Sequence, residues 1–263
     1  MLGLGSGLVY IGELSQDTPT SFSGLDLWLK VNTGVVGEDG GASADGDMAD
    51  GEDITSWADQ SGKGRHALGT PTDTAKPHWE TDAADFGGLK WPDTDVGTHM
   101  DLTAEKDVKI LANTDFTIMI RAKITNFGGA NALIGSTPKD VIKWSTNKRV
   151  AIKIGDNVVT EFEEASATLA TDTYYIHTLT RTDRSTGNLT YHIHGGSYSD
   201  KFWENDSSTR QDTDEFDITN IGCAADGVLS TEGVIKDVII WNGTALTSAQ
   251  RNKMYLYING QEY

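Results

Sequence analysis

The sequence predicts an all-β protein, a two-sheet antiparallel jelly-roll sandwich with one short C-terminal helix. Apolar stretches of strand length recur along the chain, and many are rich in β-branched and aromatic residues. Turn residues such as Gly155-Asp156-Asn157 separate these stretches at short intervals. Only the last segment of the chain has a helical pattern. Many short strands with a single helix are typical of a sandwich.

The first strand is expected at residues 25–31, with Leu25, Leu27 and Leu29 on one face and Trp28 on the other. We expect the strands that follow it at residues 76–79, 87–91, 100–102 (a sheet edge), 116–124, 132–134, 141–144, 150–154, 158–162, 174–181 and 188–194.

The last strand is expected at residues 234–241, which are almost continuously apolar and β-branched. This composition is typical of a strand that is covered on both faces. Lys236 and Asp237 are the two residues that interrupt the apolar run. The sequence therefore predicts an inner strand of a sheet that is packed against something else.

A short helix is expected after this strand. Thr247 and Gln250 have the spacing of a capping box, and Asn259-Gly260 supplies a C-terminal stop. Met254 and Ile258 are one helical turn apart, so both can pack against the sheet.

Length and charge restrict the function classes. The chain has 263 residues, which we divide into an N-terminal arm at residues 1–23 and a sandwich domain at residues 24–263. Cys223 is the only cysteine, so we expect no disulfide within the chain and folding in a reducing cytoplasm. The net charge of −18 disfavours nucleic acid as a partner. No run of about 18 apolar residues is present, so no membrane partner is expected.

The first ten residues, MLGLGSGLVY, alternate apolar residues with glycine. They include no basic residue, and glycines break the apolar run, so no signal peptide is expected. Two interpretations stay open: a disordered tail, or an arm that docks on a neighbouring subunit.

A motif after the first strand reads ITSWADQSGKGRHA. Trp57 is expected to fill the core at the end of a short strand. Asp59 and Ser61 are expected to bond the backbone of the following turn, where Gly62 and Gly64 accept positive φ. Turn chemistry accounts for each of these residues, so a structural role is favoured.

This motif resembles the signature of laminin-G-like domains in the concanavalin A-like lectin/glucanase superfamily. The closing strand, turn and helix, which end in ALTSAQRNKMYLY, resemble the end of the same domains. The segments GLDLWLK and ITNIG are similar to family positions as well. The resemblance spans residues 24–258 and implies the concanavalin A-like sandwich. Lectins, hydrolases and structural modules share this fold, so the resemblance implies no single activity.

A Leu/Gly N-terminus ahead of such a domain resembles virion structural proteins of marine tailed phages. That resemblance implies a protein made in the host cytoplasm and located in the virion. Its partners would be capsid or tail proteins, held through the arm and edge loops, with a homo-oligomer as a further option.

An acidic, glycine-rich stretch after the first strand includes Asp45, Asp47 and Asp50. Closely spaced carboxylates on such a backbone can wrap a cation of calcium's size. The spacing is out of register with an EF-hand, and no helices flank it. A solvated loop is the favoured interpretation, with a calcium site as the alternative, and no other cofactor is expected.

No catalytic set is complete in the sequence. Retaining glucanases of the superfamily need paired carboxylates, in the pattern E-x-D-x-x-E. The nearest match, Glu215-x-Asp217-x-x-Asn220, has an amide in place of the last acid. His192 and His194 share one strand face, but no further ligand completes a metal site. We therefore expect that the protein is not an enzyme.

Carbohydrate binding remains open. Tyr198, Phe202 and Trp203 lie in a Gly-, Ser- and Asp-rich stretch that is predicted as a loop, where an exposed aromatic ring can stack on a pyranose. The favoured interpretation is that these residues cover the end of the sandwich, because large aromatic side chains are mostly buried.

The predicted function is a non-enzymatic virion structural protein, either a capsid decoration or a tail- or fibre-associated protein. The first alternative is a carbohydrate-binding module that recognises host surface glycans. The second alternative is a glycoside hydrolase.

Overall fold

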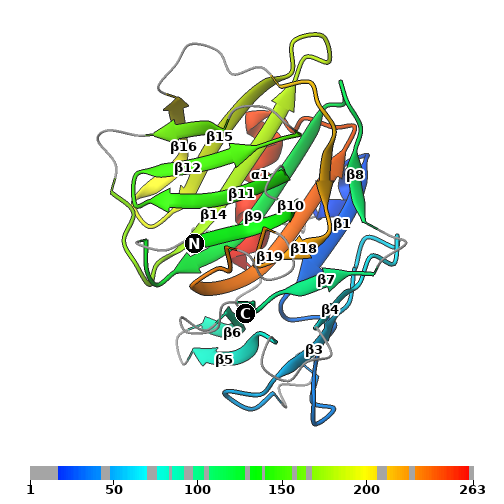
Figure 1. The fold of residues 1–263 in the computed structure, drawn as a ribbon, viewed down its shortest axis with the longest axis vertical. Helices are drawn as coiled ribbons and strands as arrows, with labels where there is room; N and C mark the ends of the chain where they lie inside the picture. The colour runs from blue at the N-terminus through cyan, green and yellow to red at the C-terminus, as the bar shows by residue number, and fades with distance from the viewer. Residues whose placement is uncertain are drawn as a thin grey trace, which may run out of the picture.

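The computed structural model describes residues 17–42, 48–69, 76–82, 85–91, 97–103, 107–127, 131–137, 140–155, 159–163, 168–205, 212–224 and 229–260. Two antiparallel sheets pack face to face, and helix α1 (Ser248–Asn259) lies behind them (Figure 1). The predicted all-β sandwich with one short C-terminal helix is confirmed. Within the described ranges, no helix is long and apolar enough to cross a membrane.

Sheet A holds the long central strands. Its members are β1 (Leu25–Lys30), β5 (His78–Asp82), β6 (Asp85–Trp91), β9 (Phe116–Ile124), β14 (Tyr174–Thr182), β15 (Asn188–Gly195), β16 (Tyr198–Asn205) and β19 (Gly233–Asn242). Hydrogen bonds order them as β16-β15-β14-β9-β19. β19 then pairs with β6 at its start and with β1 further along, and β5 pairs with β6. The predicted inner strand is therefore confirmed.

Sheet B is built from shorter strands. They are β2 (Val35–Gly37), β3 (Ile54–Trp57), β4 (Ala67–Gly69), β7 (Met100–Leu102), β10 (Asn131–Thr137), β11 (Asp140–Thr146), β12 (Arg149–Lys153), β13 (Thr160–Glu163) and β18 (Asn220–Ile221), and β8 (Val108–Ile110) pairs with β17 (Phe216–Ile218) as a separate ribbon. The end of β16 pairs with β13, so β16 joins the two sheets. The prediction of a sheet edge at 100–102 is wrong, because β7 pairs with β4 on one side and β18 on the other.

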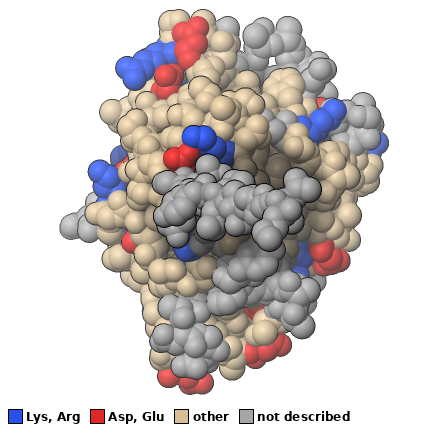
Figure 2. Space-filling view, turned by 180° about the vertical axis from the view of Figure 1, so that it is seen from behind, with Lys and Arg blue, Asp and Glu red and all other residues tan. Residues whose placement is uncertain are grey.

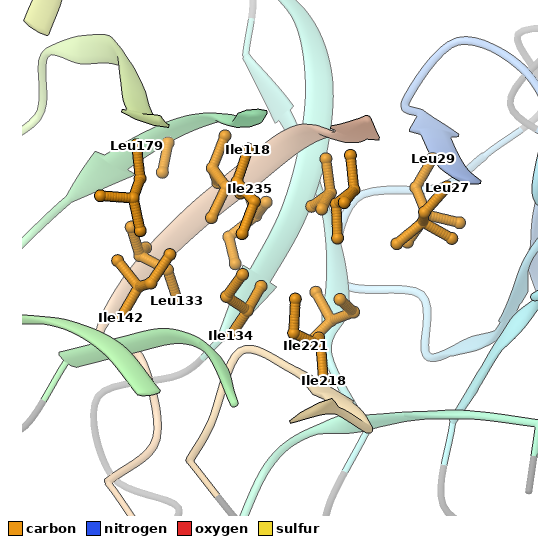
Figure 3. Packing of buried hydrophobic residues seen from close by; sticks show 14 of the residues in the cluster. Leu27, Leu29, Ile118, Leu133, Ile134, Ile142, Leu179, Ile218, Ile221 and Ile235 are labelled. Atoms are coloured by element: carbon orange, nitrogen blue, oxygen red, sulfur yellow. The ribbon is translucent and has the colours of Figure 1, made fainter. Parts of the chain in front are cut away.

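The main core fills the space between the sheets. Figure 3 shows Ile118 and Ile235 of sheet A facing Leu133 and Ile134 of sheet B. Burying one such side chain contributes about 1.5–3 kcal/mol. Trp57 lies in the same core with 0% exposure, and its Nε1 donates a hydrogen bond to the Lys30 carbonyl at 3.0 Å, which confirms its structural role.

Asp59 organises the turn after Trp57. Its carboxylate accepts hydrogen bonds from the backbone N–H groups of Trp28 at 3.0 Å, Ser61 at 2.8 Å and Arg65 at 3.0 Å. Burial opposes the ionisation of Asp59, but the hydrogen bonds outweigh it and lower the pKa of this carboxyl. The turn chemistry predicted for the motif is confirmed.

Helix α1 forms a second apolar cluster on the outer face of sheet A. Met254 and Ile258 pack there with Trp241 of β19, as the sequence predicts. The capping box between Thr247 and Gln250 is present at the helix start. Nearly every residue of β19 is buried, because one face of the strand meets the main core and part of the other meets α1.

A register shift in β1 changes the face that one leucine takes. The shift lies between Leu25 and Leu27. Leu27 and Leu29 point into the main core, whereas Leu25 packs beneath α1 together with Trp28. The predicted common face of the three leucines is therefore wrong for Leu25, because a bulge reverses the alternation of side chains.

Candidate functional site

The outer face of sheet A carries both candidate binding surfaces. Helix α1 covers one half of this face, and a charged cluster occupies the other half. Seen from behind, Lys or Arg side chains lie next to Asp or Glu side chains at several places among larger areas of uncharged residues (Figure 2).

The charged cluster consists of Lys30, Arg121, Lys123, Lys236 and Asp237, on β1, β9 and β19. Arg121 and Lys30 lie directly opposite Asp237 on the two neighbouring strands. A register shift immediately before Asp237 marks a bulge at Lys236. The bulge explains how two consecutive charged residues of a buried strand reach the same cluster.

Tyr174 provides the aromatic surface of the charged cluster. Its ring centroid lies 4.3 Å from Lys236 Nζ, 5.1 Å from Lys123 Nζ and 5.2 Å from Arg121 Cζ. Cations within about 6 Å of a ring are attracted to its face. Burial raises the pKa of Asp237 to about 6, although nearby cations, led by Arg121, oppose the shift. The cluster therefore holds a buried carboxyl group whose pKa lies well above the ordinary value of an aspartate.

A groove of about 490 Å³ adjoins the cluster, and we call it the β5–β6 groove. Glu80 links the two, since its carboxylate oxygens lie 2.9 Å from Lys90 Nζ in the groove and 2.8 Å from Lys123 Nζ in the cluster. Burial opposes the ionisation of Glu80, but the two lysines outweigh it and lower its pKa. The groove is lined by Asp50, Gly51, His78, Trp79, Glu80, Thr81 and Lys90.

Hydrogen bonds and a close contact between His78 and Asp53 fix the walls of the β5–β6 groove. Asp50 Oδ1 accepts a hydrogen bond from the Thr81 backbone N–H at 2.8 Å. His78 Nδ1 lies 2.5 Å from Asp53 Oδ1. Backbone hydrogen bonds tie residues 51–54 to β5 and the residue before it. The polar groups therefore hold their positions without a ligand.

The aromatic row is the second surface, and it consists of Phe202, His192, His194 and Tyr255. Phe202 lies opposite His192 across β15 and β16, with ring centroids 5.3 Å apart. His194 stacks on Tyr255 of α1 at 4.3 Å, with 13° between the ring planes. Asn259 Nδ2 donates to His194 Nε2 at 3.3 Å. The row thus runs from β16 across β15 to α1.

The three aromatic residues predicted to bind sugar do not share one surface. They lie on strand β16, so the predicted loop is wrong. Trp203 is 0% exposed in the main core, and Tyr198 packs against that core with its ring 6.2 Å from Tyr175. Phe202 points to the other face and is 44% exposed. Successive residues of a strand alternate in direction, so Phe202 can act as a platform and Trp203 cannot.

The acidic stretch, for which a calcium site was the alternative interpretation, is only partly described. Asp45 and Asp47 lie outside the described residues. Asp50 is exposed and lines the β5–β6 groove. Within the described ranges, no group of three or more His, Cys, Asp or Glu residues could hold a metal ion.

The residues of the E-x-D-x-x-N match are separated by the fold. Glu215 is exposed just before β17, and Asp217 lies within it, 3.9 Å from Lys109 Nζ. Asn220 is buried on β18 of sheet B, where its Nδ2 donates to Asp101 Oδ1 at 2.6 Å. The three side chains therefore do not line one groove.

The groove residues His78, Glu80 and Lys90 do not appear among the sites predicted from the sequence. A partial signal was present, because His78 and Lys90 lie in two segments that were expected to be strands, and Glu80 follows the first segment on the same strand face as His78. What the sequence does not show is that Glu80 meets Lys123, which lies 43 residues further along the chain.

Comparison with known proteins supports the fold. No protein-family model matches the chain, and no curated protein sequence matches it. An arabinofuranosidase complexed with arabinofuranosyl-alpha-1,2-xylobiose has a TM-score of 0.56 at 12% identity, with 92% of this chain and 60% of that chain covered. Domain 4 of AbnA, a GH43 extracellular arabinanase from Geobacillus stearothermophilus, in complex with arabinotriose, has a TM-score of 0.50 at 13% identity, with 88% and 97% covered.

The binding domain of botulinum neurotoxin serotype G has a TM-score of 0.51 at 15% identity, with 89% of this chain and 51% of that chain covered. The chain therefore spans about half the length of that domain and 60% of the arabinofuranosidase. These similarities show the β-sandwich fold and nothing finer, since one sandwich serves many functions.

Proposed function

We propose that this chain is a non-catalytic, lectin-like module that binds a glycan at the aromatic row. The exposed ring of Phe202 beside His192 carries the proposal. An exposed ring gives an apolar face for a pyranose, while nearby imidazole and amide groups fix its orientation by hydrogen bonds. The stacked His194 and Tyr255 hold one end of the row in place.

The structural comparisons are consistent with this proposal. The arabinanase domain that resembles the chain over 97% of its own length is a complex with arabinotriose. That domain shows that a sandwich of this kind and size can bind an oligosaccharide.

We further propose that the module is not an enzyme. A retaining glycosidase needs two carboxyl groups facing one bond, one of them with a raised pKa to act as acid. In the β5–β6 groove, Glu80 instead has a lowered pKa beside Lys90 and Lys123. Asp217 and Asn220 lie on different strands. Incubation with a polysaccharide panel should release no reducing ends above a buffer control.

A glycan array, followed by titration of the best ligand, tests the binding proposal. Phe202→Ala should weaken affinity about tenfold, the upper end expected for losing one aromatic pair. Leu111→Ala is the matched control, because Leu111 is a 60% exposed apolar side chain outside the aromatic row. Equal affinity of Phe202→Ala and wild type, or no glycan bound by either, contradicts the proposal.

The wider setting we propose is the virion, where the module would attach to capsid or tail proteins and present the aromatic row to host glycans. The Leu/Gly arm and the resemblance to phage virion proteins support this setting. Deleting Met1 to Gly12 should leave thermal unfolding unchanged and abolish incorporation into particles. Wild-type occupancy of the truncated protein would contradict the role of the arm.

A further inference from the structure

The β5–β6 groove lies at the opposite edge of sheet A from the aromatic row. The sheet runs from β16, which carries Phe202, through β15, β14, β9 and β19 to β6 and β5. We propose that the groove is a second binding site, for a neutral polyhydroxylated ligand such as an uncharged sugar residue. This ligand binds in the groove independently of any glycan at the aromatic row.

The size and lining of the groove suit such a ligand. Its volume of about 490 Å³ lies within the range of roughly 300–1,000 Å³ found for small-molecule sites. The carboxylates of Asp50 and Glu80 accept hydrogen bonds, and the Lys90 ammonium donates them. The Thr81 hydroxyl and the His78 imidazole can do either. Sugar hydroxyls also donate and accept, so they can pair with every one of these groups.

The groove is organised before any ligand binds. Glu80 is held by Lys90 and Lys123, and Asp50 is held by the Thr81 backbone. The Asp53 carboxylate contacts the His78 imidazole and fixes its orientation. Side chains that are already ordered lose little rotamer entropy on binding, which favours affinity for a small polar ligand.

The charge pattern favours a neutral ligand over an ion. The lining includes two carboxylates, Asp50 and Glu80, and the ammonium group of Lys90, with Glu80 and Lys90 in direct contact. A ligand of either sign therefore meets repulsion as well as attraction, whereas hydroxyl groups can bond to both. Trp79 is only 5% exposed, so recognition rests on hydrogen bonds and not on stacking.

Saturation-transfer NMR and titration with arabinotriose and the methyl glycosides of glucose, galactose, mannose and xylose test the proposal. At least one of these probes should bind, and Asp50→Asn should weaken it about tenfold, as expected for losing a hydrogen bond to a charged group. The amide oxygen introduced by this substitution can still accept from the Thr81 N–H, so the wall is kept. Glu215→Gln is the matched control, an exposed carboxylate outside the groove.

Thr81→Val is the second variant, because it removes the hydroxyl and leaves the backbone N–H that bonds Asp50. It should also weaken the probe, and Phe202→Ala should leave binding in the groove unchanged. The proposal is overturned if no neutral probe binds, if both groove variants bind like wild type, or if methyl glucuronide binds more tightly than every neutral glycoside. Repeating the titrations in the Phe202→Ala background separates these results from any glycan bound at the aromatic row.

Discussion

The two halves of the outer face of sheet A are built on the same strands and differ in what they bury. On β9, Met119 lies in the apolar cluster under α1, whereas Arg121, two residues further along, belongs to the charged cluster. On β14, Ile176 lies under α1 and Tyr174 faces the charged cluster. Two neighbouring positions on the same face of a strand can therefore lie in different environments, one in the apolar cluster under α1 and the other at the charged cluster.

Helix α1 is too short to cover the whole outer face of sheet A. With 12 residues, α1 spans about 18 Å, so it shields only part of the face. Apolar side chains under α1 stabilise the fold by leaving water. Buried charges gain little net stability, because desolvation offsets their attraction. The apolar half should thus carry the stability of this face, while the charged half adds pH dependence and borders the β5–β6 groove.

The largest expected loss of stability comes from a substitution in the apolar cluster under α1. Met254→Ala should lower the free energy of unfolding by about 2–5 kcal/mol, because Met254 is fully buried and its loss leaves a cavity. Leu256→Ala on the same helix is the control, since Leu256 is 70% exposed and should change stability by less than about 0.5 kcal/mol. Urea unfolding followed by circular dichroism measures both. Equal losses for the two variants would show that α1 does not hold this half.

The next largest effect is a change of stability with pH, which depends on Asp237 in the charged cluster and on His177 in the main core. Burial lowers the pKa of His177 in the core to about 3, and His177 Nδ1 pairs with the Tyr191 hydroxyl at 2.8 Å. Its unfolded pKa is about 6.5, so His177 removes stability as pH falls below that value. Asp237 has a folded pKa of about 6 and an unfolded pKa near 3.9, so its contribution is lost as pH rises through this window.

Between about pH 4 and pH 6 the two groups therefore act in opposite directions, each by about 1.4 kcal/mol per pH unit. Asp237→Asn removes the titrating carboxyl group of Asp237 and leaves His177 in place. Relative to wild type, this variant should lose about 2–3 kcal/mol more on going from pH 6 to pH 4. Denaturant melts at both values measure the difference. Parallel pH profiles for variant and wild type would show that Asp237 is not a buried, titrating group.

The sequence predicts the apolar half better than the charged half. Residues 234–241, Met254 and Ile258 follow from apolar periodicity, which depends only on local sequence. Lys236 and Asp237 are visible as an interruption, but a bulge that brings both to one face depends on pairing with β9.

The candidate sites were predicted only in part for a similar reason. The stretch Tyr198–Asn205 is polar enough to be taken for a loop, yet pairing with β15 makes it a strand and places Phe202 and Trp203 on opposite faces. The β5–β6 groove depends on contacts between segments far apart in the chain, such as Glu80 with Lys123. Periodicity within one segment does not report such contacts.

The smallest expected effect tests whether α1 is held by its buried face or by its ends. Thr247 Oγ1 accepts from Gln250 N–H at 3.4 Å, and Gln250 Oε1 accepts from Thr247 N–H at 2.8 Å. Thr247→Ala removes the first of these caps and should cost about 1 kcal/mol. Most stability of a short helix comes from tertiary packing, so this loss should stay below that of Met254→Ala. Hydrogen exchange should show faster exchange confined to the first turn of α1, with β19 unaffected. A Thr247→Ala loss as large as that of Met254→Ala would mean that the cap, and not the apolar half, keeps α1 on sheet A.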